Sequence, residues 1–284
     1  MNTPTLPTHQ MRRLQAHYGF GGMPFRKNVP THRMFDSRSQ RDLAHGLRLW
    51  SEIHGLSLLA SPTGNGKSIT TRKFATELDD ARFKVFRLNH VPTTPMGFLR
   101  SLNRVLCLPP RRNLADLFDQ VRNYLYGYAE AHGPHPMLII DDAEGMRPET
   151  LDIIRRLTTS RLDADDTFSV LLIGTEDLLM TLRQAQLAPL QSRFTYVAQL
   201  RPFSLEDTIN YVRFHLKEAG GDPELFTDEA VRHIFHASQG TPRKINQLAL
   251  QALIQAAVES RNAIDGRFMR QQIDAHPLYT RGDQ

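Results

Sequence analysis

The eight residues from Ser61 to Ser68 carry the clearest chemical signal in the chain, and they follow an apolar run at residues 56–60. A glycine-rich loop after a strand points its backbone N–H groups inward at phosphate oxygens, because glycine allows the turn and the close approach. Lys67 can then reach the β- and γ-phosphates, Ser68 offers a hydroxyl to Mg²⁺, and the following helix presents its positive end. The pattern predicts a nucleoside triphosphate site. Its predicted binding residues are Ser61, Pro62, Thr63, Gly64, Asn65, Gly66, Lys67, Ser68 and Ile69.

One position departs from the phosphate-loop pattern. The pattern G-x-x-x-x-G-K-[ST] has glycine at its first position, where this chain has Ser61. Serine adopts most turn conformations, so we expect the loop to form. The consequence of the exchange for ATP turnover stays open.

A second signal, an acidic one, lies downstream, where the apolar residues 137–140 end in Asp141 and Asp142. An acid at the end of such a strand holds Mg²⁺, mostly through water, and we assign this role to Asp141. Asp142 is placed to orient or deprotonate the attacking water. Many such ATPases carry Glu there, and the shorter Asp holds the water less firmly. We expect the nearby Glu144 to point elsewhere.

Thr175 follows the next apolar strand and precedes a predicted helix that begins at Glu176. A polar group at this strand tip can contact the γ-phosphate or its water. A hydroxyl at the same position can equally cap the helix. Both interpretations remain open on sequence grounds.

Two arginines occupy positions from which they can act on phosphates. Arg193 follows a short helix and can project across a subunit interface toward a neighbour's γ-phosphate, an arrangement that contributes about 10³- to 10⁵-fold in rate elsewhere. Arg243 opens a helix whose first turn is fixed by Pro242, and it can couple that helix to the nucleotide. The plainer alternatives are a solvated surface arginine and an ordinary helix start. The predicted catalytic set is Lys67, Asp141, Asp142, Thr175, Arg193 and Arg243.

Strands and helices alternate over most of the chain, and the strands are apolar on both faces. This pattern predicts an α/β fold with a parallel sheet between layers of helices. We expect strands at 56–60, 83–88, 137–140, 168–173 and 194–200, and helices at 37–53, 67–78, 96–106, 114–131 and 148–159. After Pro202 only helices follow, at 205–219, 228–238 and 242–258. The expected division is an irregular N-terminal arm at 1–35, a core at 36–202, a small all-helical C-terminal lid at 203–262 and a tail at 263–284.

Composition limits the classes of protein to consider. The chain has 284 residues, 40% hydrophobic and 23% charged, as in ordinary globular proteins, and its net charge of +5 suits a polyanionic partner. Cys107 is the only cysteine, which excludes an intrachain disulfide, and we expect it to be buried as a small apolar residue. There is no secretory h-region and no bilayer-length apolar run, so we expect a soluble, cytoplasmic protein without a membrane partner.

Four segments together resemble the AAA+ ATPases, and within them the ExeA/TnsC/TniB group. They are Tyr18-Gly19-Phe20 with Pro24-Phe25, Asp141-Asp142-Ala143-Glu144, the stretch 172–178, and Gly240-Thr241-Pro242-Arg243-Lys244-Ile245-Asn246. The resemblance spans about residues 15 to 260. It implies an AAA+ P-loop NTPase that binds and hydrolyses ATP with Mg²⁺. The group includes transposition regulators that assemble on DNA, and a secretion-associated branch that carries a membrane span and a peptidoglycan-binding domain, neither of which appears in this sequence.

The resemblance also implies which residues meet ligands. Tyr18 and Phe20, in the arm, would pack near the adenine. The loop containing His90, Thr93 and Thr94 would face DNA. Further candidates for DNA phosphate contact are Arg111, Arg112, Arg155 and Arg156. Such contacts would be independent of base sequence and sensitive to salt.

The leading hypothesis is an ATP-dependent regulator of DNA transposition that oligomerises on duplex target DNA. It would form a ring or a helical filament, hexameric per turn, hydrolyse ATP slowly, and recruit or activate a transposase, with a target-selection protein as a possible further partner. One alternative is a replication helicase loader or initiator-type ATPase. Another is a nucleotide-switched interaction protein that scarcely hydrolyses ATP and binds only protein. Duplex DNA binding separates the last of these from the others.

Overall fold

The structure is a computed structural model that describes residues 9–26, 33–159 and 167–279. The chain divides into two compact units. The core unit comprises Ser39–Arg201, and the helical unit combines the residues before Ser39 with those from Pro202 onward. Each unit therefore has its own hydrophobic interior.

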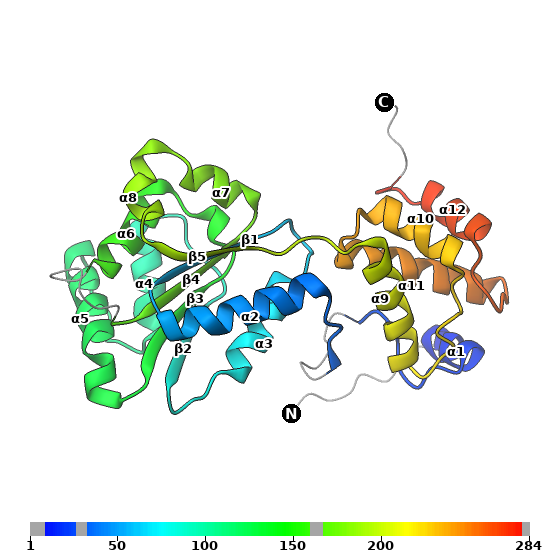
Figure 1. Cartoon of the computed structure of the whole chain (residues 1–284), viewed down its shortest axis with the longest axis horizontal. Coiled ribbons are helices and arrows are strands. Elements are labelled where there is room, and N and C mark those ends of the chain that lie inside the picture. Colours follow the sequence, from blue (N-terminus) through cyan, green and yellow to red (C-terminus); the bar gives the residue numbers. More distant parts are fainter. Residues whose placement is uncertain (1–8, 27–32, 160–166, 280–284) are drawn as a thin grey trace. The chain divides into compact units, whose positions relative to one another are not determined.

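The core unit is built on a five-stranded parallel sheet with the order β2-β3-β4-β1-β5 (Figure 1). The strands are β1 (Leu56–Ala60), β2 (Phe83–Leu88), β3 (His135–Ile140), β4 (Ser169–Gly174) and β5 (Phe194–Gln199). All residues of β1 and β4 are buried, as expected for strands covered on both faces. The predicted α/β fold with a parallel sheet is confirmed.

Helices cover both faces of this sheet. The helices of the core unit are α2 (Arg38–Ile53), α3 (Lys67–Glu77), α4 (Pro95–Val105), α5 (Leu114–His132), α6 (Pro148–Thr158), α7 (Glu176–Leu182) and α8 (Ala188–Gln191). Trp50 of α2 and Phe74 of α3 pack with Leu59 on one face. Leu125 of α5 packs with Leu172 on the other face. The sheet is thereby enclosed, and its carboxyl edge is left for loops.

One strand begins earlier than its apolar run indicates. We expected β3 to start at Met137, but it starts at His135 and includes Pro136, which pairs with Lys84. Proline has no N–H for the ladder, which argues against a strand position. Here the backbone N–H of His135 donates to the carbonyl of Arg82 at 2.8 Å, so the strand is anchored before the proline.

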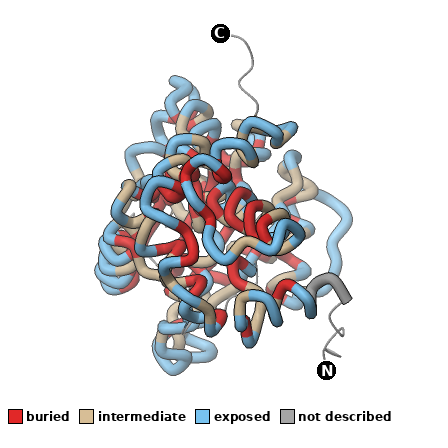
Figure 2. Tube along the Cα trace, turned by 90° about the vertical axis from the view of Figure 1, so that its right-hand side faces the viewer, coloured by how far each residue is buried: buried red, intermediate tan, exposed pale blue. Residues whose placement is uncertain are grey.

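The helical unit contains α1 (His9–Tyr18), α9 (Leu205–Glu218), α10 (Asp228–Ser238), α11 (Pro242–Val258) and α12 (Gly266–Asp274). Side chains cap several of these helices, and Ser204 with Asp207 forms a full capping box at α9. Phe226, Leu248 and Phe268 lie in its interior. Figure 2 shows buried segments in the middle of the unit that faces the viewer, with exposed turns around them.

The N-terminal arm is more ordered than we predicted. Residues His9–Tyr18 form a helix, and Leu14, Phe20 and Phe25 are buried in the helical unit. The Phe20 ring lies 2.2 Å from where a Cβ on Gly221 would stand, so only glycine allows this contact. Prediction failed here because these side chains are buried by packing against distant helices rather than by a local repeat.

The predicted C-terminal tail also contains structure. Residues Gly266–Asp274 form α12, capped by Asp265, whose carboxylate accepts from the N–H of Phe268 at 2.7 Å. Phe268 and Met269 are buried in the helical unit. The helix is short and mostly polar, and it carries few apolar residues from which a periodic pattern can be recognised.

The expectation of a buried Cys107 was wrong. Its side chain is exposed, and its φ of 56° is left-handed. The N–H of Cys107 donates to the carbonyl of Arg104 at 3.1 Å, so this residue terminates α4 instead of packing in the core. Separately, none of the helices in the described ranges is long and apolar enough to cross a membrane.

Candidate nucleotide site

The phosphate loop follows β1 at the carboxyl edge of the sheet. Gly64 and Gly66 have φ values of 90° and 96°, which side chains rarely tolerate. Gly66 is the N-cap of α3, and Lys67 is its first residue. The first N–H groups of a helix have no partner within the helix, so the start of α3 is suited to bind an anion.

Lys67 is held inside the loop. Its side chain is buried, and its ammonium group donates to the carbonyls of Ser61 at 2.6 Å and of Pro62 at 3.2 Å. To reach a phosphate, the ammonium must exchange these carbonyls for phosphate oxygens. Thr63 and Ser68 are exposed, and Asn65 is buried.

The Asp pair lies directly beyond β3. The N–H of Asp141 continues the sheet by donating to the carbonyl of Leu88 at 2.9 Å. A carboxylate oxygen of Asp141 accepts from the N–H of Asp142 at 3.0 Å. Asp142 is exposed, has a φ of 56°, and turns the chain into a short 3₁₀ helix at Ala143–Gly145. The turn thus orients Asp141 and presents Asp142 to solvent.

Several buried polar atoms in this region have no hydrogen-bond partner. They include Thr175 Oγ1, Asn65 Oδ1, Thr70 Oγ1 and Glu144 Oε2. Unsatisfied buried groups are uncommon and call for a ligand or water. The loop glycines, the start of α3 and the Thr70 and Thr175 hydroxyls suit a phosphate-bearing ligand, whereas the Asn65 and Glu144 oxygens can only accept hydrogen bonds, as from water. Ser68 with Asp141 offers the oxygens that Mg²⁺ prefers.

The structure gives no support to the capping interpretation of Thr175. It is the N-cap residue of α7, but its side chain makes no capping hydrogen bond. Glu144, which we expected to point elsewhere, lies against the tip of β4, with Oε2 at 3.1 Å from where a Cβ on Gly174 would stand. Thr175 and Glu144 are thus neighbours of the same strand end.

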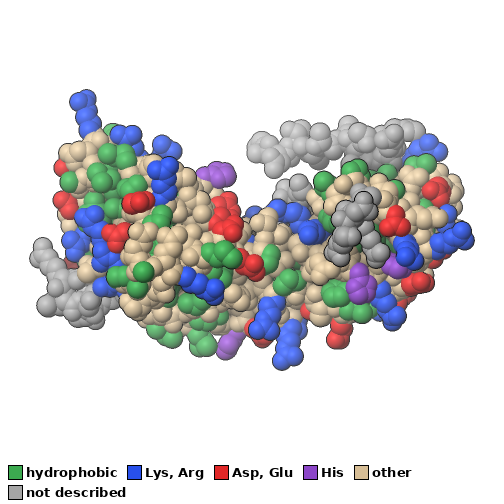
Figure 3. Space-filling view, turned by 90° about the horizontal axis from the view of Figure 1, so that it is seen from above, with side chains coloured by type: hydrophobic (Ala, Val, Ile, Leu, Met, Phe, Trp, Pro, Cys, Tyr) green, Lys and Arg blue, Asp and Glu red, His purple; other side chains and the backbone are tan. Residues whose placement is uncertain are grey.

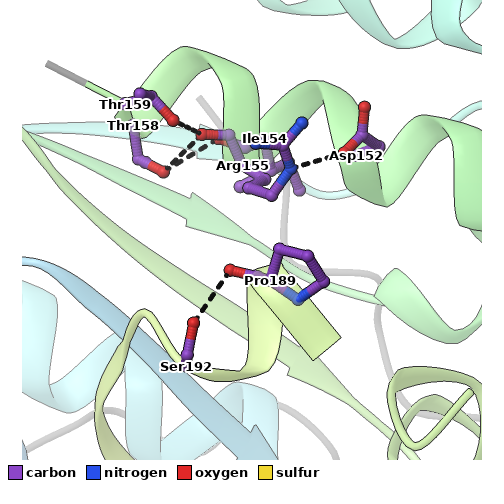
Figure 4. A network of polar contacts seen from close by, with 7 residues as sticks. All are labelled: Asp152, Ile154, Arg155, Thr158, Thr159, Pro189 and Ser192. Carbon is purple, nitrogen blue, oxygen red and sulfur yellow. Dashed lines mark hydrogen bonds and ion pairs between the residues drawn. The ribbon is translucent and has the colours of Figure 1, made fainter. Parts of the chain in front are cut away.

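The two arginines lie in different units. Arg193 follows α8 in the core unit, and its N–H donates to the carbonyl of Leu190 at 3.1 Å. Ser192 Oγ donates to the carbonyl of Pro189 at 3.1 Å, which fixes the end of α8 (Figure 4). Arg243 is exposed in the first turn of α11 in the helical unit.

The loop predicted to face DNA is ordered by its neighbours. The carbonyl of Thr93 accepts from Thr150 Oγ1 at 2.6 Å and from the N–H of Arg147 at 3.4 Å. Thr94 caps α4 through its hydroxyl, and His90 is exposed. Arg147 is exposed beside this loop, and we did not predict it. A basic residue directly before the helix-starting Pro148 was the available signal.

The other predicted DNA contacts are partly engaged within the protein. Arg155 Nε pairs with Asp152 Oδ1 at 2.6 Å (Figure 4). The Arg156 guanidinium lies over the Phe118 ring at 4.8 Å, and Arg111 Nε donates to Gln120 Oε1 at 2.9 Å. Arg112 is exposed. Figure 3 shows Lys and Arg side chains in several groups interspersed with acidic ones.

A parallel sheet in this strand order, with a phosphate loop after β1 and an acid after β3, defines the AAA+ P-loop NTPase fold. Residues 53–182 match the family described as AAA domain. This match and the fold support the AAA+ ATPase group.

One relative is general secretion pathway protein A of Aeromonas hydrophila, 31% identical over 246 residues. The match covers 84% of this chain and 44% of the relative, so the chain spans less than half the length of that protein.

Solved structures share the fold at low identity. Cdc6p from Pyrobaculum aerophilum is 18% identical with a TM-score of 0.64, over 92% of this chain and 71% of that one. The Aeropyrum pernix ORC2 protein is 13% identical with a TM-score of 0.65, over 88% and 71%. Drosophila ORC bound to DNA is 14% identical with a TM-score of 0.60, over 96% and 68%. At these identities the likeness concerns the fold.

Proposed function

We propose that this chain is an ATP-dependent, DNA-binding AAA+ regulator of DNA transposition. The main support for ATP binding and hydrolysis is the phosphate loop, in which Lys67 is buried. The buried Thr175 hydroxyl beside it has no hydrogen-bond partner. These groups lie where a parallel sheet of this type receives its ligand, beyond the carboxyl ends of the strands. The chain would act in the cytoplasm, where ATP and DNA meet.

Each site residue has a defined task in this proposal. Lys67 leaves the carbonyls of Ser61 and Pro62 and binds phosphate oxygens. Mg²⁺ would be held by Ser68 and Asp141, where it would neutralise charge on the phosphates. Asp142 orients the attacking water, and Thr175 donates to the γ-phosphate or to that water.

Residues outside the phosphate loop would complete the site on assembly. Arg193 would reach the γ-phosphate of a neighbouring subunit, and Arg243 would act from the helical unit. Tyr18 and Phe20 also belong to the helical unit, so any adenine contact from them would come from that unit. Hydrolysis would therefore be slow in the monomer and faster in a ring or filament.

DNA binding is proposed for the loop before α4. His90 and Arg147 are exposed there, and the Thr93 carbonyl is tied to the start of α6, so the loop has a fixed shape. Two structures with this fold, Drosophila ORC and the Aeropyrum pernix ORC1 protein, contain DNA. Phosphate contacts from such a loop would position the protein on duplex DNA without reading bases.

An initiator-type or helicase-loading ATPase is the second candidate, and the likeness to Cdc6p and ORC favours it. A nucleotide-switched protein that binds only other proteins is the third. The first two differ in their DNA preference, because a loader acts at defined sites whereas a target-marking filament covers any duplex.

The test measures binding of labelled duplexes of unrelated sequence, with Mg²⁺ and either a non-hydrolysable ATP analogue or no nucleotide, across a salt series. We expect nucleotide-dependent, salt-sensitive binding that is equal for all sequences, with oligomers visible by negative-stain microscopy. Preference for one sequence would favour the initiator candidate. A protein that binds nucleotide but no duplex would favour the third candidate. Stimulation of an added transposase then tests the recruiting role.

A further inference from the structure

The serine that departs from the phosphate-loop pattern makes a specific buried contact. Ser61 is only 2% exposed, and its Oγ donates to the carbonyl of Leu200 at 2.6 Å. The bond joins residues that are 139 positions apart in the chain. Glycine, the usual residue at this position, has no side-chain donor for that carbonyl.

The Leu200 carbonyl also meets a second residue of the loop. Asn65 Nδ2 donates to it at the longer distance of 3.4 Å. The N–H of Leu200 donates in turn to the carbonyl of Ala60 at 3.2 Å. The beginning and the tip of the phosphate loop are thus both attached to the residue that follows β5.

Ser61 also contacts the groups that would respond to nucleotide. Its N–H donates to the carbonyl of Gly174 at 3.1 Å, directly before Thr175, and its own carbonyl accepts from Lys67 Nζ at 2.6 Å. If Lys67 turned to a phosphate, the Ser61 carbonyl would lose this bond, and a shift of the Ser61 backbone would displace the Leu200 carbonyl that its hydroxyl holds. Ser61 therefore links the lysine to Leu200.

Leu200 lies at a particular place in the chain. The core unit ends at Arg201 and the helical unit begins at Pro202. We propose that Ser61 is a positioning residue that couples nucleotide in the phosphate loop to the segment where the chain leaves the core unit. This inference rests on the proposed nucleotide binding and assigns a function to the serine.

The experiment compares amide hydrogen exchange at residues 198–201 in the wild type, Ser61→Gly and Ser61→Ala, each with and without a non-hydrolysable ATP analogue and Mg²⁺. Ser61→Gly restores the usual loop residue and so keeps the loop foldable. Without nucleotide, we expect both variants to exchange about 3- to 10-fold faster there, the range expected for one lost hydrogen bond. The analogue should protect this segment in the wild type and protect it clearly less in the variants.

Matched variants separate coupling from general damage. Thr76→Ala removes an exposed hydroxyl of α3 outside the phosphate loop, and it should leave exchange at 198–201 unchanged with and without nucleotide. Ser61→Thr, which retains a hydroxyl, should restore much of the nucleotide-dependent protection. A purely structural role for Ser61 would raise basal exchange and leave the protection by nucleotide intact.

The outcomes distinguish the two proposals. Equal exchange and equal protection in the wild type and Ser61→Gly would overturn the coupling, while nucleotide affinity measured on the same samples would still support the ATP site. A wild-type protein that binds no nucleotide would overturn the proposed function, and the coupling with it.

Discussion

The core unit and the helical unit differ in how many of their buried polar atoms lack a hydrogen-bond partner. Buried side-chain atoms without partners occur in the core unit at Trp50, Ser57, Asn65, Thr70, Asn103, Glu144 and Thr175. Within the described part of the helical unit, the same condition is met only by Asn246 Oδ1. The helical unit is a packed, well-capped scaffold, whereas the core unit leaves groups unsatisfied near its phosphate loop. Substitutions in the core unit are therefore expected to impair function first, whereas substitutions in either unit are expected to lower stability.

The largest effect on stability is expected when a side chain is removed from the hydrophobic interior of the helical unit. Phe20→Ala deletes a ring that is 5% exposed and rests on Gly221, and such truncations cost about 3 to 5 kcal/mol. Urea unfolding should show this loss as a lower free energy of unfolding. Val258→Ala, at a position that is 74% exposed, is the matched control and should change stability by about 0.5 kcal/mol or less. A Phe20→Ala protein as stable as the control would contradict the assignment of the arm to this interior.

Acid should weaken both units over one pH window. Burial lowers the pKa of His215 in the helical unit to about 4, and burial followed by the charge of His54 lowers the pKa of His135 in the core unit to about 4. The His54 and His135 rings are stacked at 3.8 Å. The unfolded chain takes up these protons near pH 6.5 and the folded chain only near 4, so stability falls as the pH drops from about 6.5 to about 4.

Single substitutions measure how much of that loss of stability arises in each unit. For buried His215, a pKa difference of this size corresponds to about 3 kcal/mol at most, and partly exposed His135 should contribute less. His215→Phe should flatten the pH dependence of the free energy of unfolding between pH 6.5 and 4, and His135→Phe should do so to a smaller extent. An unchanged slope in His215→Phe would show that this side chain is not buried as a neutral ring.

The smallest effect on stability and a clear effect on binding are expected at the phosphate loop. Lys67→Ala removes the charged donor to phosphate oxygens, and such bonds are worth about 1.5 to 3 kcal/mol, or roughly 10- to 100-fold in affinity. Binding of a fluorescent ATP analogue measures this loss. Lys84→Ala removes an exposed lysine of the same unit and should bind normally. Equal affinities for the two variants would place the nucleotide elsewhere.

Local patterns were sufficient to predict most of the core unit and two helices of the helical unit. The apolar runs at β1, β3 and β4 are buried strands, and α10 and α11 begin and end where the spacing and the Gly and Pro residues indicated. In these elements the residues that determine the structure are neighbours in sequence. The same holds for the glycines of the phosphate loop, whose left-handed φ values follow from the motif.

What could not be predicted depends on distant partners. Phe20 is buried by Gly221, Ser61 bonds to Leu200, and Glu144 lies against Gly174. None of these pairs leaves a periodic trace in the sequence. The exposure of Cys107 likewise follows from a left-handed turn after α4, for which a cysteine gives no signal. Sequence patterns therefore located the candidate site but did not show the contacts that support it.

The helical unit is formed by residues from before and after the core unit. Because these residues are synthesised at different times, the two units fold in a set order. Helix α1 is synthesised before α11, yet it packs against α11, and Phe20 and Phe25 are buried among helices that follow residue 202. The core unit contains all of its own strands and can fold while the later helices are still being made. Until then the aromatic side chains of the arm stay exposed. A chain interrupted after the core unit would therefore combine a folded core unit with an exposed aromatic segment, and chaperones that bind apolar surface would recognise that segment.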